Sequence, residues 1–369
     1  MKTAFRCALL SLGLAGCLDL SVLQSGANPP DMALPMDMAM PVDMATPVDM
    51  VTPPVDMAMD MATPTMWTNV TPTPAPGKLY AISGNASGGA TTLYVASAAG
   101  AVLKSTNGTA FSSLAVGGTR DLLALWVKDA TTVYVVDANG DTYATANGGA
   151  MAADWANKMS MEGGIVRAVF GQTGTDSVLI GGANTTRALF LKPTSGNTWS
   201  AADNLTAQGK QIYGIFAGAA YYVTVGDNRA AKCTDPLTAA TCAALSKSGF
   251  AGSPILTAVH GTADNNVWIA TEDGNLAQSD LTAGNNLMTK RTSVAGGNFA
   301  AVWVKSATEV WVAGTAGGGQ RIWLWDGTTM QNKTGNLPTN YTLTGIWGDG
   351  SGTIWVVGNN GTAGGIFKH

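Results

Sequence analysis

A short apolar run recurs seven times after residue 78, and no other feature limits the possible folds so strongly. The runs read LYAIS, LLALW, VRAVF, IYGIF, LTAVH, FAAVW and LTGIW, 43 to 46 residues apart. One position before each last residue stands Ile, Leu or Val, and two positions before it stands Ala or Gly. Units of about 40–50 residues are typical of propeller blades. The last residues of the runs are Ser83, Trp126, Phe170, Phe216, His260, Trp303 and Trp347.

A second apolar run follows each of the first ones. It reads TLYVAS, TVYVVD, SVLIGG, YYVTVG, NVWIAT, EVWVAG and TIWVVG, as expected for strands that are buried on both faces. Asn-Gly and Asp-Gly turns come after it, as in hairpins, and weaker third and fourth runs complete most units. The chain is therefore predicted to be all-β, a seven-bladed β-propeller. The Ala/Gly column fits a crowded position near the axis, and the aromatic column fits the space between neighbouring blades.

The seventh unit lacks a fourth strand, because the chain ends at GGIFKH. The isolated segment 66–70, MWTNV, could supply that strand and so close the ring. Closure would pair the two ends of the propeller and remove an exposed sheet edge. We therefore expect the propeller domain to span residues 66–369.

The first residues, MKTAFRCALLSLGLAGC, combine a basic start, an apolar run and small residues before a cysteine. This pattern predicts a secretory signal peptide over residues 1–16. The small residues before Cys17 resemble the lipobox of bacterial lipoproteins, which implies cleavage there and lipidation of Cys17. An ordinary signal peptide is the alternative. Leu18 replaces the Asp that marks inner-membrane retention in enteric lipoproteins, so we expect an outer-membrane lipoprotein, on the periplasmic side or the cell surface.

Residues 17–65 are rich in Pro, Asp and Met and contain the repeated phrase PVDM. Proline prevents a continuous helix, and the aspartates oppose insertion into lipid and contact with an anionic surface. The segment is predicted to be a disordered tether between the lipid anchor and the propeller. A Cu(I) site on the methionine thioethers is the alternative, but no histidine or cysteine supports it, so we expect no metal and no cofactor.

Charge and cysteine content limit the possible partners further. The net charge is −4, while residues 18–77 alone carry seven aspartates and no Lys or Arg. Residues 1–17 carry +2, so residues 78–369 carry −4 + 7 − 2 = +1 and contain no basic stripe. Nucleic acid is therefore not expected as a partner, and we expect a monomer. Cys233 and Cys242 remain in an oxidising compartment and are predicted to form a disulfide.

The phrases LTGIWGDGSGTIWVVG and FAAVWVKSATEVWVAG resemble the Trp-rich propeller repeats of myxobacterial lipoproteins. They also resemble the wider group with Asp-box (BNR) and photosystem II assembly factor-like repeats. Ser105-Thr-Asn-Gly-Thr-Ala-Phe111 is a degraded Asp-box, with Asn for Asp and Phe for Trp. The resemblance covers residues 79–369 and implies a fold only, because Asp-boxes occur in proteins with and without enzymatic activity.

Few residues suggest catalysis. His260 occupies the aromatic column and is interpreted as a core residue, and His369 is the last residue. The segment Asp137-Ala-Asn-Gly-Asp141 is faintly similar to a calcium loop, but a plain hairpin turn is the favoured interpretation. No catalytic residue is assigned. An enzyme acting on extracellular polysaccharide, a hydrolase or a lyase, remains the alternative function.

Binding is the favoured function, with a protein or a glycan as the ligand. In a propeller, the loops before the first strand and between the second and third strands share one face. Arg167 is singular because it lies inside a predicted innermost strand, three residues before the column aromatic. A charge there needs water, a partner or a ligand. The candidate residues of this face are Arg120, Arg167, Lys210, Arg229, Asp273 and Arg321.

Overall fold

The computed structural model describes residues 66–159, 165–172, 177–183, 189–192, 200–201, 211–235 and 241–369. The predicted signal peptide and tether, Cys17 and Lys210 lie outside these residues. The described residues belong to one compact unit. Among the described residues, no helix has the length and apolar character needed to cross a membrane.

The described strands form seven sheets, one for each repeated unit, and we number them as blades in chain order. Blade 1 is β2 (Leu79–Ser87), β3 (Ala90–Ser97), β4 (Ala101–Ser105) and β5 (Ser112–Ala115). Blade 2 is β6 (Leu122–Val127), β7 (Val133–Asp137), β8 (Thr142–Thr145) and β9 (Ala156–Met159), with the 3-10 turn η2 (Ala152–Asp154) before β9. Blade 3 is β10 (Ile165–Gly171), β11 (Val178–Ala183), β12 (Leu189–Lys192) and β13 (Ser200–Ala201).

The remaining blades follow the same order, with additions in two of them. Blade 4 is β14 (Ile212–Ala217), β15 (Tyr222–Gly226), β16 (Arg229–Cys233) and β17 (Cys242–Ala244). Blade 5 is β19 (Leu256–Ala263), β20 (Asn266–Thr271), β21 (Asn275–Ser279) and β22 (Leu287–Ser293), and β18 (Ser246–Ser248) pairs with β22 in parallel. Blade 6 is β23 (Asn298–Ser306), β24 (Glu309–Ala316), β25 (Gly319–Trp325) and β26 (Met330–Asn332). Blade 7 is β27 (Thr342–Gly348), β28 (Ile354–Asn360), β29 (Ala363–Lys368) and β1 (Thr68–Asn69).

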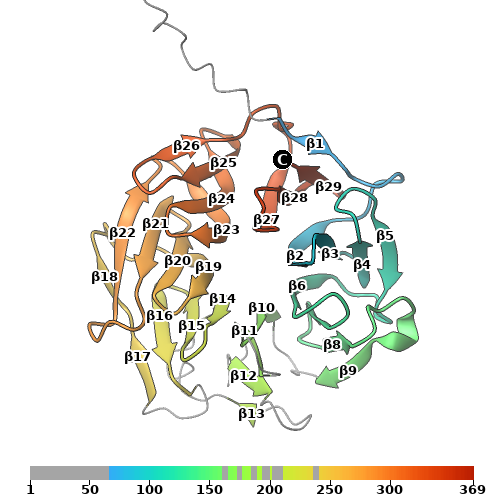
Figure 1. Cartoon of the computed structure of the whole chain (residues 1–369), viewed down its shortest axis with the longest axis horizontal. Coiled ribbons are helices and arrows are strands. Elements are labelled where there is room, and N and C mark those ends of the chain that lie inside the picture. Colours follow the sequence, from blue (N-terminus) through green and yellow to red (C-terminus); the bar gives the residue numbers. More distant parts are fainter. Residues whose placement is uncertain are drawn as a thin grey trace, which may run out of the picture. The chain divides into compact units, whose positions relative to one another are not determined.

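The blades are arranged in a ring (Figure 1), with the first long strand of each blade innermost. Each innermost strand contacts the innermost strand of the next blade, and β27 contacts β2. Within every blade, consecutive strands are antiparallel. The predicted all-β propeller is confirmed.

Residues from the two ends of the propeller complete blade 7. In β1, Thr68 pairs with Lys368 and Asn69 with Phe367 of β29. Trp67 is 4% exposed, and its indole Nε1 donates to the Lys333 carbonyl at 2.8 Å. The segment before the first blade therefore covers the edge of β29 and inserts an indole between blades 6 and 7.

The aromatic column packs each blade against the next with matched side-chain sizes. Trp347 packs on Gly84 of blade 1, and Trp303 packs on Gly348 of blade 7. A Cβ at Gly348 would lie 2.6 Å from the Trp303 ring, closer than real Cβ contacts allow. Where the column residue is smaller, the next blade carries a larger residue at this position: Val127 follows Ser83, Ala217 follows Phe170, and Val304 follows His260. Steric complementarity across each blade boundary therefore accounts for the aromatic column and for the size of the residue that follows that column in the next blade.

The Ala/Gly column is also explained by close packing, though the neighbour is the next blade and not the axis alone. A Cβ on Gly214 would lie 3.1 Å from the Val259 backbone nitrogen, and one on Gly345 would lie 3.2 Å from that of Ile82. Both contacts reach the innermost strand of the following blade. Side chains larger than Ala would therefore push neighbouring blades apart.

Blades 4 and 5 carry two local reinforcements. Cys233 and Cys242 are direct partners across β16 and β17 and form a disulfide, as predicted. The chain then continues into β18, which covers the edge of β22 through the pairs Ser246–Leu287 and Ser248–Thr289. An edge strand that is covered in this way cannot pair with another chain over those residues.

Candidate functional site

Every innermost strand contains a β-bulge at the same place. The register shifts once near the start of β2, β6, β10, β14, β19, β23 and β27, between the first buried residue and the Ala/Gly column. A bulge leaves one residue unpaired and re-aims its side chain. The seven extra residues, which we call the bulge ring, are Tyr80, Leu123, Arg167, Tyr213, Thr257, Ala300 and Thr344.

The bulge ring has one large and one small half. Following the blades, Tyr80, Leu123, Arg167 and Tyr213 are consecutive, and the other three positions hold Thr, Ala and Thr. Arg167 and Ala300 are exposed, and the other members are half-buried. The large side chains of the ring, including its charge, therefore gather on blades 1 to 4.

Three members of the ring connect their blade to the next one by hydrogen bonds. The Tyr80 hydroxyl donates to the Asp121 carboxylate of blade 2, and burial together with this bond raises the pKa of Tyr80 to about 12. The Thr257 hydroxyl donates to the Phe299 carbonyl at 2.6 Å, and the Thr344 hydroxyl donates to the Leu79 carbonyl at 2.9 Å. These side chains are committed to holding blades together.

Arg167 is placed differently. Its guanidinium carbon lies 5.8 Å from the centre of the Tyr213 ring in blade 4, a cation–π contact. Burial raises the pKa of Tyr213, and Asp227 raises it further. Ile165, two residues before Arg167, is 46% exposed. No hydrogen bond or ion pair joins Arg167 to another of the described residues, so its five N–H groups remain available to a ligand.

Arg120 is held within its own blade. Its Nη1 lies 3.4 Å from an Asp141 carboxylate oxygen and 4.0 Å from an Asp137 oxygen. The other Asp137 oxygen accepts backbone N–H bonds from Asn139 and Asp141, each at 2.9 Å. The segment similar to a calcium loop is therefore a hairpin turn capped by a guanidinium. Across the described residues, no group of three or more His, Cys, Asp or Glu side chains is placed to hold a metal.

Arg229 of blade 4 and Asp273 of blade 5 each lie near Lys247 of β18. Burial lowers the pKa of Lys247; the Asp273 carboxylate opposes this shift and the Arg229 charge adds to it. Asp273 also accepts from the Thr271 hydroxyl at 2.5 Å and from the Asn275 amide at 2.6 Å. Arg321 of blade 6 donates to the Gln320 carbonyl at 2.8 Å. The predicted residues thus divide into several local groups.

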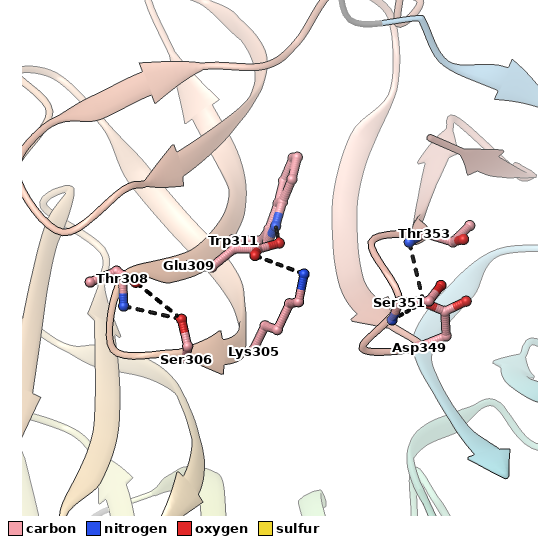
Figure 2. A network of polar contacts seen from close by, with 8 residues as sticks. All are labelled: Lys305, Ser306, Thr308, Glu309, Trp311, Asp349, Ser351 and Thr353. Atoms are coloured by element: carbon pink, nitrogen blue, oxygen red, sulfur yellow. Dashed lines mark hydrogen bonds and ion pairs between the residues drawn. The ribbon is translucent and has the colours of Figure 1, made fainter.

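The opposite ends of the innermost strands carry turns whose polar groups satisfy each other (Figure 2). Lys305 and Glu309 pair at 2.9 Å, and the Trp311 indole donates to Glu309 at 3.3 Å. Partial burial disfavours ionised Asp349, but hydrogen bonds from Ser351 and Thr353 outweigh it and lower the pKa of Asp349. The Asp349 carboxylate thus stabilises its turn and stays ionised, which does not suit a general acid.

His260 has the core role expected from its column. Its Nδ1 accepts the Val304 backbone N–H of blade 6 at 3.0 Å, and its ring centre lies 6.5 Å from that of Trp303. Burial lowers the pKa of His260 to about 4, so the imidazole is neutral at pH 7. The imidazole thus takes the place that Trp or Phe holds in other blades, and it accepts a backbone N–H at the boundary of blades 5 and 6.

Sequence reasoning missed Lys247, Tyr80 and Tyr213 as members of this face. Lys247 lies in a segment that gave no strand signal, since the other blades have no equivalent of β18. The tyrosines share a repeat column with Arg167, and that column was the available signal. That it is the bulged position follows only from the strand pairing.

Comparisons with known proteins support the fold. No family model and no curated protein matches the chain. YCF48 from Cyanidioschyzon merolae is structurally similar, with TM-score 0.60 and 16% identity, over 82% of this chain and 98% of that one. A structure of YCF48 bound to D1 peptide gives TM-score 0.59 at 14% identity, over 83% and 98%. The extracellular domain of a putative hybrid two-component system from B. thetaiotaomicron gives TM-score 0.61 at 13% identity, over 82% of this chain and 39% of that one. At these identities the likeness is one of fold.

Proposed function

We propose that the chain is a lipid-anchored, seven-bladed propeller that acts as a non-catalytic binding module for a protein or glycan. Arg167 is the observation that carries this proposal. It is a charged side chain on a bulged residue of an innermost strand, exposed, stacked near Tyr213, and without a counter-charge among the described residues. The ligand would lie across the large half of the bulge ring and replace the water bound to the Arg167 N–H groups.

Two solved propellers of this fold support a binding role by analogy. One was determined bound to D1 peptide, and another is the extracellular domain of a putative hybrid two-component system. Fold similarity does not transfer a ligand. It does support the view that a ring of blades with varied loops can serve recognition without catalysis.

The proposed anchor determines where the ligand is met. Lipidation at Cys17 would attach the chain to the outer membrane, facing the periplasm or the exterior. The 48 residues between Cys17 and Met66 could extend on the order of 150 Å in polyproline II form. The propeller could then reach a partner well away from the bilayer.

Capture of partners by the full chain tests the proposal. Wild-type protein and an Arg167→Ala variant would be used to isolate envelope proteins and to probe a glycan array. We expect the variant to lose the bound partner and to keep its melting temperature. Lys305→Ala, at the other end of the strands, is the control and should bind normally. Equal capture by Arg167→Ala and wild type would refute the role of the bulge ring.

A further inference from the structure

Blade 5 carries a cleft of about 380 Å³ that the proposed binding face does not use. Its polar lining is Asn265, Gln278, Asp280, Asn285, Thr289 and Arg291. Only Ala283 and Leu287 add apolar surface. The walls come from strands β21 and β22 and from the β19–β20 and β21–β22 turns. These turns lie at the ends of the strands opposite the β20–β21 turn of the candidate face. The volume falls in the range of small-molecule sites, about 300–1,000 Å³.

A second bulge directs the main charge of the cleft. The register of β21 with β22 shifts between Leu276 and Ala277: Leu276 pairs with Thr292 and Ala277 with Lys290, so Arg291 is the extra residue. Bulges occur next to functional sites because they re-aim a side chain. Arg291 is exposed, and its Nε donates to the Gln278 side-chain oxygen at 3.0 Å. The guanidinium is thus oriented, and its terminal N–H groups make no hydrogen bond to the described residues.

A hydrogen-bond chain fixes the floor of the cleft to the core. The Gln278 amide donates to the Asn266 side-chain oxygen at 3.3 Å, and the Trp268 indole donates to the same oxygen at 2.7 Å. Trp268 is 1% exposed and packs between blades 5 and 6. The orientation of Gln278, and through it Arg291, is therefore set before any ligand binds, which lowers the entropy cost of binding.

The charges of the cleft are separated along the strands. Asp280 lies at the end of β21, near Leu287, while Arg291 lies four residues further along β22. At about 3.3 Å per residue, the two are on the order of 13 Å apart. One Asp280 oxygen is occupied by the Thr282 hydroxyl and backbone N–H. The other oxygen can accept hydroxyl groups.

We propose that this cleft binds a saccharide that bears a carboxylate, a uronic acid unit held at Arg291 with a neighbouring sugar toward Asp280. A guanidinium binds a carboxylate by two parallel hydrogen bonds. The amides of Asn265, Gln278 and Asn285 and the Thr289 hydroxyl can replace the water around sugar hydroxyls. An apolar ligand would strip that water without replacing its hydrogen bonds. A peptide fits less well, because little apolar surface receives its side chains and Lys232 lies near enough to Asp280 to offset its charge.

A matched pair of sugars tests the site on the full chain. Titration calorimetry would compare cellobiouronic acid, which carries one carboxylate, with neutral cellobiose. We expect binding of the acid, much weaker binding of the neutral sugar, and a loss of roughly tenfold or more in Arg291→Gln. Lys290→Gln is the control, because Lys290 adjoins Arg291 and does not line the cleft.

Three outcomes would overturn the assignment: neither sugar binds, the two variants lose affinity equally, or a dipeptide such as glycylglycine binds more tightly than the acidic sugar. Arg167→Ala should leave this titration unchanged. Since the two sites use different residues and opposite strand ends, failure of one proposal leaves the other standing.

Discussion

At the scale of single residues, stability depends on size matching across blade boundaries. A tryptophan or phenylalanine in one blade faces a glycine or alanine in the next, and the smaller Ser83 and His260 face valines. The pairs are separated by more than forty residues in the chain, so neither partner has a local reason for its size. Each becomes intelligible only beside the other.

The pair Trp303 and Gly348 makes this testable. Gly348→Val should destabilise the protein by about 1–3 kcal/mol through overpacking. Trp303→Ser should cost about 3–5 kcal/mol through a cavity. The double variant recreates the natural pair Ser83 and Val127, so its loss should be smaller than the sum of the two single losses. Urea denaturation of the four proteins measures the coupling, and additive losses would contradict the packing model.

His260 gives stability a specific pH dependence. Its pKa is about 4 in the folded protein and about 6.5 when unfolded, so the unfolded state binds the proton first as pH falls. The contribution of neutral His260 to stability is fully present above pH 6.5, and the free energy of unfolding decreases by roughly 3 kcal/mol between pH 6.5 and 4. In His260→Asn an oxygen can accept the Val304 N–H without titrating. The variant should therefore show a smaller slope of unfolding free energy against pH over this interval, and an equal slope would assign the effect to other groups.

At the scale of strands and blades, the seven innermost strands repeat one device, a bulge before the Ala/Gly column. The bulge sends Tyr80, Thr257 and Thr344 to the next blade and leaves Arg167 exposed. The same element thus connects blades and presents a recognition residue. The resemblance to Asp-box repeats is also visible at this scale. Ser105 and Asn107 cap the turn between β4 and β5, and the Trp355 indole donates to the Gly108 carbonyl.

The disulfide in blade 4 should act at the same scale. It joins β16 to β17 and closes a short loop, since the cysteines are nine residues apart. Removing it frees the unfolded chain and should cost about 3 kcal/mol. We expect the Cys233→Ala, Cys242→Ala variant to melt at a lower temperature than wild type and to be insensitive to reductant. If reductant leaves the wild-type melting temperature unchanged, the staple contributes little.

At the scale of the whole molecule, closure of the ring depends on both ends of the propeller. Trp67 packs beside His369, with ring centres 5.3 Å apart. The Trp67 backbone N–H donates to the Asn336 side-chain oxygen, and the Trp67 carbonyl accepts from the Asn336 amide N–H. Between blades 7 and 1, the Asn359 amide accepts from the Leu79 N–H at 2.6 Å and donates to its carbonyl at 2.9 Å. The boundary of blade 7 with blade 6 and its boundary with blade 1 are thus both stabilised by contacts between residues far apart in the sequence.

Truncating Trp67 tests this closure. Trp67→Ala should lose about 3–5 kcal/mol of stability, because a buried indole and its hydrogen bond to Lys333 are removed. Met66→Ala is the control, since Met66 is 60% exposed. Thermal unfolding of the two variants shows whether the buried Trp67 indole, and not simply any change in this segment, stabilises the protein. Similar melting temperatures for both would show that the Trp67 side chain is not needed for closure.

Much of the fold was predictable from the sequence because it repeats. The apolar columns mark the innermost and second strands of every blade, and the spacing marks the blade boundaries. The site was less predictable. Arg167 stood out as the one charge in a column of otherwise uncharged residues. Lys247 lies in β18, which has no equivalent in the other blades, and Arg291 lies in a fourth strand, where the repeat pattern is weak. The partners of Arg120 come from a turn that resembled an ion-binding loop.

The sequence by itself determined the repeated unit, the residues that fill the blade boundaries and the cysteines that pair. These follow from side-chain size, polarity and spacing, which are local properties read directly from the chain. Only the tertiary structure decided which face of a strand each polar residue occupies. A bulge adds one residue and reverses the alternation beyond it, and whether it forms depends on the partner strand. The bulge ring and the Arg291 cleft both arise in this way, from strand register.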